Sequence, residues 1–104
     1  MAKIIATAEN FSFGPAGKLV TVCRKLIEQG HELTFIGEGT AYQLASKLNF
    51  HKIYKFDTDS KEFMSWGEEI FKEADALLSS VDRSSVILAQ RVGLPVIWLD
   101  MLFW

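Results

Sequence analysis

The feature that most constrains the fold is a regular alternation between short apolar runs and longer segments with helical spacing. The apolar runs occupy residues 2–8, 33–36, 53–56, 76–81 and 95–99, and each is short enough to be a buried strand. Between the first two runs, apolar residues from Leu19 to Ile27 recur every three or four positions. Parallel strands need connections of helical length, so this alternation predicts a mostly parallel sheet.

We therefore predict an α/β fold, a Rossmann-like open parallel sheet of five strands in the order 3-2-1-4-5 with helices on both faces. Lys52 and Lys55 alternate with apolar residues in the third run, which indicates an edge strand. Pro15 suits the first turn of the first helix. Gly30 and Gly93 stand where left-handed residues end helices.

Two further helix starts are predicted from capping patterns. Asp59 and Glu62 resemble a capping box, with Asp59 in the capping role, ahead of an apolar stripe that runs to Ala74. Asp82 is expected to cap the helix that Gly93 closes.

Composition limits the classes of function. The chain has 104 residues, 49% of them hydrophobic, and a formal charge of -2 without a run of either sign, so it fits one domain and disfavours nucleic-acid binding. Cys23 is the only cysteine, so no internal disulfide can form, and we expect a buried thiol. No apolar stretch has the length of a signal peptide core or a membrane span, so we expect a cytoplasmic protein.

Ligands of open parallel sheets bind at the carboxyl ends of the strands, where the strand order reverses. In this sheet the reversal lies between the first and fourth strands, so the segments to consider are residues 9–17 and 79–84, with Asp100 after the fifth strand. The candidate substrate-binding residues at this edge are Asn10, Ser12, Gly14, Gly17, Lys18, Ser80, Asp82 and Arg83.

Two readings remain open for each of these segments. Residues 14–18, GPAGK, could bring backbone N–H groups to a phosphate or sugar, or could form a structural tight turn; their spacing does not match a nucleotide-triphosphate loop. The polar residues 79–85 could hold a sugar or another polyol, or could simply cap a helix.

Other reactive residues are assigned no catalytic role. His31 and His51 are expected in turns at the amino-terminal edge of the sheet. No group of residues has metal-ligand spacing, no serine nucleophile elbow is present, and no cofactor is expected. Trp66, Trp98 and Trp104 are predicted to be core or interface residues.

Two segments resemble glycosyltransferases of the GT-B fold. LIEQGHELTF at residues 26–35 resembles the L-x-x-x-GHEVTF segment that follows the first helix of that family. ADALLSS at residues 74–80, followed by AQRVGLPVI at residues 89–97, resembles the PDLVVSD … A…A…LGIPVI segment. The two segments occur in the family's order and spacing.

The resemblance implies an N-terminal domain that binds a small-molecule acceptor, while a C-terminal domain absent from this chain holds the nucleotide-sugar donor. Such enzymes transfer a hexose to an acceptor hydroxyl with help from a general base, and the isolated domain would be inactive. Many members have a histidine after the first strand, but this chain has Asn10 to Gly14 there and no histidine. Glu9 is then the nearest substitute as the catalytic base.

The last residues, LDMLFW at 99–104, are apolar and directly follow a predicted buried strand. We therefore expect residues 1–104 to be a single α/β domain and the N-terminal fragment of a longer two-domain protein. The competing expectation is a small protein that forms a homodimer through this apolar end. The alternative function is a free-standing flavodoxin-like or receiver-like binding domain without catalytic activity. A receiver domain has a pair of acidic residues after the first strand and an aspartate at the end of the third. Glu9 and Asp57 match this pattern weakly, but no lysine follows the fifth strand.

Overall fold

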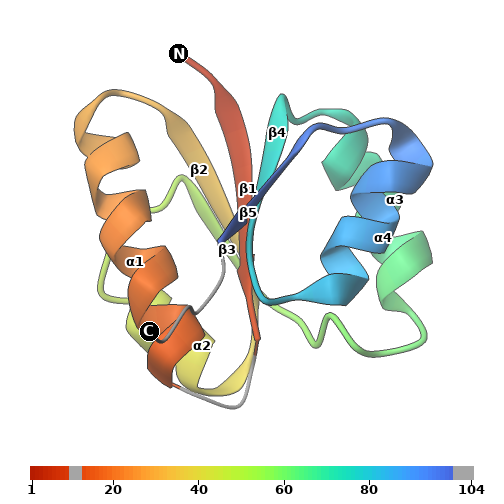
Figure 1. Cartoon of the computed structure of the whole chain (residues 1–104), viewed down its shortest axis with the longest axis horizontal. Coiled ribbons are helices and arrows are strands. Elements are labelled where there is room, and N and C mark those ends of the chain that lie inside the picture. The colour runs from red at the N-terminus through yellow and green to blue at the C-terminus, as the bar shows by residue number, and fades with distance from the viewer. Residues whose placement is uncertain (10–12, 100–104) are drawn as a thin grey trace, which may run out of the picture.

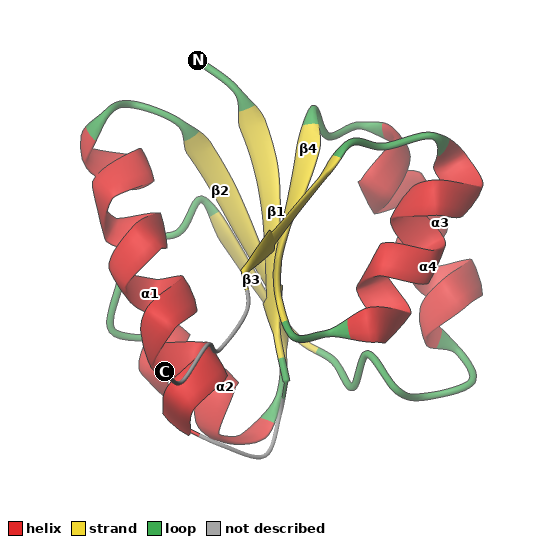
Figure 2. Cartoon of the chain, in the orientation of Figure 1, coloured by secondary structure: helices red, strands yellow, loops and turns green. Residues whose placement is uncertain are grey.

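The computed structural model describes residues 1–9 and 13–99 of the chain (Figures 1 and 2). Strands and helices alternate along all of this length. In chain order the elements are β1 (Lys3–Ala8), α1 (Phe13–Glu28), β2 (Glu32–Gly37), α2 (Gly39–Ala45), β3 (Lys52–Lys55), α3 (Phe63–Lys72), β4 (Ala76–Ser80), α4 (Arg83–Val92) and β5 (Val96–Leu99).

The five strands form one parallel sheet in the order β3-β2-β1-β4-β5, which confirms the predicted fold class and strand order. β1 lies at the centre, where Ala6 pairs with Phe35 of β2 and with Leu78 of β4. β3 lies at an edge, as its interleaved lysines predict.

Helices cover the sheet on both faces, with α1 and α2 on one side and α3 and α4 on the other (Figures 1 and 2). Alternate residues of β1 supply the two cores, because successive strand side chains point to opposite faces. Ile4, Ala6 and Ala8 pack in the cluster beneath α1 and α2. Ile5 packs with Phe63 and Phe71 of α3 in the other cluster.

The glycine helix ends were predicted correctly. Gly30 and Gly93 have φ angles of 89° and 77°, the left-handed conformation that glycine adopts without steric cost. Pro15 lies in the first turn of α1, as expected. Cys23 is fully buried, and burial raises the pKa of its thiol to about 12.

The start of the third helix was predicted too early. α3 begins at Phe63 rather than near Asp59, and the capping box between Asp59 and Glu62 does not form. The Asp59 N–H donates instead to Asp57 Oδ1 at 2.9 Å, and the Asp59 carboxylate accepts the Ser84 hydroxyl at 2.9 Å. These contacts hold residues 57–60 in a turn outside the helix.

The tight turn that was one of the two readings of residues 14–18 does not form, because these residues lie inside α1. Gly17 does not have a positive φ, and a Cβ atom added there would meet no atom within 4 Å. The helix therefore tolerates Gly17 without requiring it. No helix among the described residues combines the length and the apolar character that a bilayer span requires.

Candidate functional site

The carboxyl ends of β1 and β4 meet at the centre of the sheet. Thr7 pairs with Ser79 and Ala8 with Ser80, and the N–H of Glu9 continues the ladder by donating to the Ser80 carbonyl at 3.1 Å. The residues that follow β1 and those that follow β4 therefore start from adjacent positions. This is the point of strand-order reversal, where open α/β sheets bind their ligands.

Buried hydroxyl groups connect β1, β4 and the start of α4. Thr7 Oγ1 and Ser85 Oγ are 2.7 Å apart, and Ser85 Oγ lies 3.0 Å from the Asp82 carbonyl oxygen. Ser79 Oγ donates to the same carbonyl at 2.8 Å. All three hydroxyl-bearing residues are fully buried. The network gives polar groups inside the domain the hydrogen bonds that their burial demands.

Asp82 is the buried acidic residue of this network, with only 4% of its surface exposed. Its side chain makes no capping hydrogen bond to α4, although it occupies the N-cap position, so the predicted capping role was wrong. Asp82 Oδ1 accepts the Thr58 hydroxyl at 3.1 Å, while Oδ2 is buried and has no partner among the described residues.

Burial raises the pKa of the Asp82 carboxyl to about 6. Hydroxyl groups of Ser85, Thr58 and Thr7 lower the pKa, and the negative charge of Asp59 raises it, but desolvation is the largest cause. A group with a pKa in this range can carry or release a proton near neutral pH.

The turn after β3 is joined to the start of α4 by two side-chain hydrogen bonds. Thr58 donates to Asp82, and Ser84 donates to Asp59. Val81, between β4 and Asp82, has a φ of 60°, the only positive value at a non-glycine residue among those described. A β-branched residue in this region is strained, and such strain is found most often at functional sites.

The predicted site residues do not all lie open to a ligand. Ser80 is fully buried, and its hydroxyl donates to the Pro15 carbonyl at 2.8 Å, so it ties β4 to α1. Glu9 is half-buried at the edge, and Arg83 is exposed in the first turn of α4. Gly14 and Lys18 are exposed on α1.

The candidates Asn10, Ser12 and Asp100 lie outside the described residues.

Thr7 and Thr58 were missed by sequence reasoning. Thr7 is the one hydroxyl residue between Lys3 and Ala8, and a polar residue inside an apolar strand is a signal that could have identified it. Thr58 has no comparable signal, because its partner Asp82 is 24 positions away in the sequence.

A shallow cleft of about 520 Å³ also lies at the carboxyl ends of β2 and β3. Trp66 and Phe56 line it, and their rings are stacked with centroids 4.0 Å apart. Trp66 thus has the packing role that was predicted for it. Polar residues line the rest of the cleft, namely Glu38, Lys55, Asp57, Ser60 and Glu62.

Both histidines lie at the opposite, amino-terminal edge. His31 Nδ1 accepts the N–H of Ala2 at 3.0 Å, and His51 Nε2 lies 3.7 Å from Glu32 Oε1. No group of three or more potential metal ligands occurs in the part of the chain that the structure describes.

Solved structures of other proteins share the fold, and three of them are similar to nearly the whole of this chain. MurG from Acinetobacter baumannii matches 96% of this chain with a TM-score of 0.74 and 14% identity. The glycotransferase of kitacinnamycin matches 95% with a TM-score of 0.66 and 13% identity. Saccharopine dehydrogenase (L-Glu forming) from Saccharomyces cerevisiae matches 99% with a TM-score of 0.64 and 13% identity.

The chain spans only 35%, 30% and 22% of these three proteins, respectively. No protein-family model and no curated protein matches the sequence. The first two structures agree with the resemblance to GT-B glycosyltransferases, and the dehydrogenase shows that the same arrangement serves a different reaction. The chain therefore has the open α/β fold that MurG and the glycotransferase contain within their longer chains.

Proposed function

We propose that this chain is the N-terminal, acceptor-binding domain of a GT-B glycosyltransferase. In the complete enzyme a hexose passes from a nucleotide sugar, held by a C-terminal domain, to a hydroxyl group of a small acceptor. The observation that carries the proposal is the polar network of Thr7, Ser79, Asp82 and Ser85, which lies at the strand-order reversal of a sheet that MurG and a glycotransferase share.

The network supports the site from beneath. Ser79 and Ser85 are buried, and both hydroxyls donate hydrogen bonds to the Asp82 carbonyl oxygen. These bonds hold the turn after β4 in one conformation. Among the described residues that closely follow β1 and β4, Glu9 is half-buried and Arg83 is exposed, so both are charged groups that a ligand can reach. Accessible polar groups that are held in place by a rigid, buried network are able to position a substrate.

In the proposed reaction the acceptor oxygen attacks the anomeric carbon, and the bond from that carbon to the diphosphate oxygen breaks. The acceptor proton passes to a general base, for which Glu9 is the candidate. The nucleoside diphosphate leaves with the electron pair of the broken bond. Arg83 is a candidate substrate-binding residue at the same edge, because an arginine can donate several hydrogen bonds to oxygen atoms of a substrate.

The test is an NMR titration of the ¹⁵N-labelled chain with a panel of hydroxylated acceptors, nucleotide sugars and flavin mononucleotide. We expect saturable amide shifts at Glu9 and at residues 79–85 with an acceptor, and none with nucleotide sugars. Glu9→Gln should keep acceptor binding within about twofold, because a base contributes to the reaction rather than to ground-state binding.

Two results would contradict the proposal. One is the absence of any saturable acceptor shift at the carboxyl edge of the sheet. The other is tight flavin binding, which would support a flavodoxin-like domain instead. A glutamine variant of Glu62, which lies at the start of α3, provides the control for nonspecific charge effects.

A further inference from the structure

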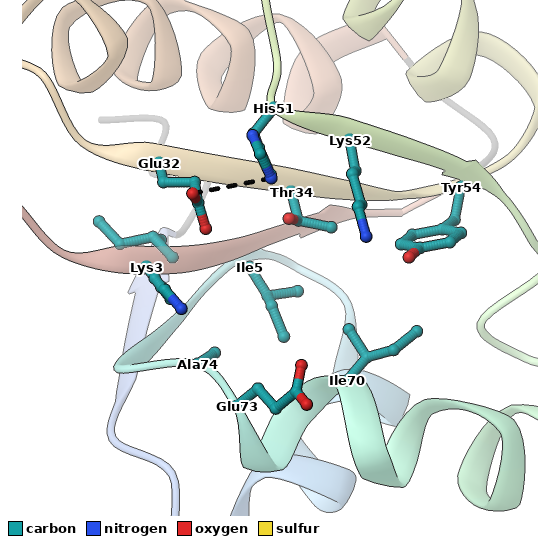
Figure 3. Close-up of a pocket in the computed structure, with 11 residues that line it drawn as sticks. Lys3, Ile5, Glu32, Thr34, His51, Lys52, Tyr54, Ile70, Glu73 and Ala74 are labelled. Atoms are coloured by element: carbon teal, nitrogen blue, oxygen red, sulfur yellow. Dashed lines mark ion pairs between the residues drawn. The ribbon is translucent and has the colours of Figure 1, made fainter.

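A second cleft lies at the amino-terminal edge of the sheet, on the face that α3 covers (Figure 3). Its volume is about 260 Å³, which suits a small metabolite rather than a drug-sized ligand. Ile5, Thr34, Ile70 and Ala74 contribute to its lining, together with the ring of Tyr54. The proposed acceptor site lies at the other end of the strands, so the two regions are separate.

The strand registers explain why charged groups surround this cleft. Lys3 pairs with Glu32, and Thr34 pairs with Lys52, so alternate residues of β1, β2 and β3 point to the same face. These positions are near the amino ends of the strands, where α3 has already ended at Lys72. Figure 3 shows the side chains of Lys3, Lys52 and Glu73 directed toward the space between the sheet and α3.

The charges at the cleft are only partly matched within the protein. Glu32 lies beside His51, with 3.7 Å between Oε1 and Nε2. Among the residues that the structure describes, no ion pair involves Lys3, Lys52 or Glu73. Lys3, Lys52 and Glu73 therefore face the cleft without an ion-pair partner, and a second carboxylate, that of Glu32, lines the cleft beside the His51 imidazole.

The two lysines can reach a common ligand. From the strand spacing and the rise per residue, their Cα atoms are about 12 Å apart, a distance that two extended lysine side chains can bridge through a small anion. Glu73 directly follows α3, and its carboxylate faces the cleft from the helix side, beside Ile70 (Figure 3). A ligand that matches Lys3, Lys52 and Glu73 carries two negative charges and one positive charge on a short hydrocarbon chain.

We infer that this cleft binds an acidic amino acid, a molecule with two carboxylates and one ammonium group. The carboxylates contact Lys3 and Lys52, the ammonium contacts Glu73, and the methylene groups lie on Ile5 and Ile70. The hydroxyls of Thr34 and Tyr54 are available as further hydrogen-bond partners for the carboxylates.

The inference is tested by titrating the ¹⁵N-labelled 104-residue chain with L-glutamate at low ionic strength. We expect saturable shifts at residues 3–5, 32–34, 51–54 and 70–74, with a Kd on the order of 1 mM. Glutarate lacks the ammonium group and L-norvaline lacks the second carboxylate, so each should bind at least about fivefold more weakly.

Variants separate specific binding from screening by charge. Lys52→Gln and Glu73→Gln should each weaken glutamate binding about tenfold. Lys72→Gln provides the matched control, because Lys72 lies at the end of α3 beside Glu68 and Glu69 and does not line the cleft. The affinity of the Lys72→Gln variant for glutamate should stay within about twofold of that of the unmodified chain.

The inference is overturned if no saturable shift appears up to about 20 mM glutamate. It is also overturned if glutarate and norvaline bind as well as glutamate, or if Lys72→Gln weakens binding as much as Lys52→Gln. Because the reporting amides lie at the amino edge, failure here leaves the acceptor titration at the carboxyl edge unaffected, and the reverse is equally true.

Discussion

At the scale of single residues, Asp82 is the group whose environment departs most from that of an ordinary carboxylate. It is almost fully buried, one oxygen accepts a hydrogen bond from Thr58, and the other has no partner among the described residues. Because its pKa is raised to about 6, ionisation of Asp82 costs more free energy in the folded protein than in the unfolded chain.

Asp82→Asn should stabilise the protein at neutral pH by about 2 kcal/mol, because the amide keeps an acceptor for Thr58 and removes the buried charge. The folded pKa is raised, so the folded state binds more protons than the unfolded state between about pH 4 and pH 6. The stability of the unmodified chain should therefore fall as the pH rises through that window.

Urea unfolding at several pH values measures this effect. The Asn variant should lose the fall between about pH 4 and pH 6. Equal slopes for the two proteins would show that Asp82 is not the group responsible.

Val81 is a second residue whose local geometry carries a prediction. With a φ of 60°, it should be relieved of strain by Val81→Gly, which we expect to raise the unfolding free energy by about 1 kcal/mol. Val86→Gly, in the interior of α4, is the control and should lower it by about 1 kcal/mol. Thermal unfolding measures both, and destabilisation by Val81→Gly would contradict the prediction.

At the scale of elements, the turn between β3 and α3 depends on side chains of a distant segment. Thr58→Val removes the hydroxyl that contacts Asp82 while keeping nearly the same shape. We expect a loss of about 1 to 3 kcal/mol in stability and faster amide exchange at residues 57–62, because a buried carboxylate loses its partner.

Thr21→Val is the control for this variant. Thr21 is exposed, and among the described residues its hydroxyl bonds only to the Gly17 carbonyl within α1, so its removal should change stability by less than about 0.5 kcal/mol. Equal losses in the two variants would show that the link between Thr58 and Asp82 has no special weight.

The elements also show how far sequence reasoning reaches. The alternation of apolar runs predicted the strand order, because crossover length and handedness leave few topologies. Sequence reasoning placed Pro15 in the first turn of the helix but left open a tight turn around Gly14 and Gly17, because glycine is a weak helix former; in the structure both glycines lie inside α1.

The start of α3 and the buried part of the site were not predictable in the same way. Asp59 had the pattern of a cap, but Ser84 offered its carboxylate a different partner. The contact between Thr7 and Ser85 joins residues 78 positions apart. Such contacts depend on which strands become neighbours, and local patterns do not contain that information.

At the scale of the whole molecule, β5 forms one edge of the sheet. Ile97 and Trp98 are 50% and 41% exposed, and they point to opposite faces. An apolar strand at an open edge can pair with another chain. We predict that the chain self-associates through β5.

Sedimentation velocity over a concentration series tests this prediction, with Ile97→Lys as the disrupting variant. It should weaken association at least about tenfold, because a lysine on an edge strand opposes pairing. Ile87→Lys is the control, since Ile87 is similarly exposed but belongs to α4. A monomer at every concentration would refute the prediction.

The central position of β1 also has a consequence for the order of folding during synthesis. β1 leaves the ribosome before the other four strands of the sheet, yet one of its two neighbours, β4, begins only at Ala76. Until then the nascent chain can pair β1 on one side alone, and the groups that later bond to β4 stay open. The first of the five strands to be synthesised thus gains its second neighbour late, and pauses in translation before residue 80 would prolong the period in which it can misassemble.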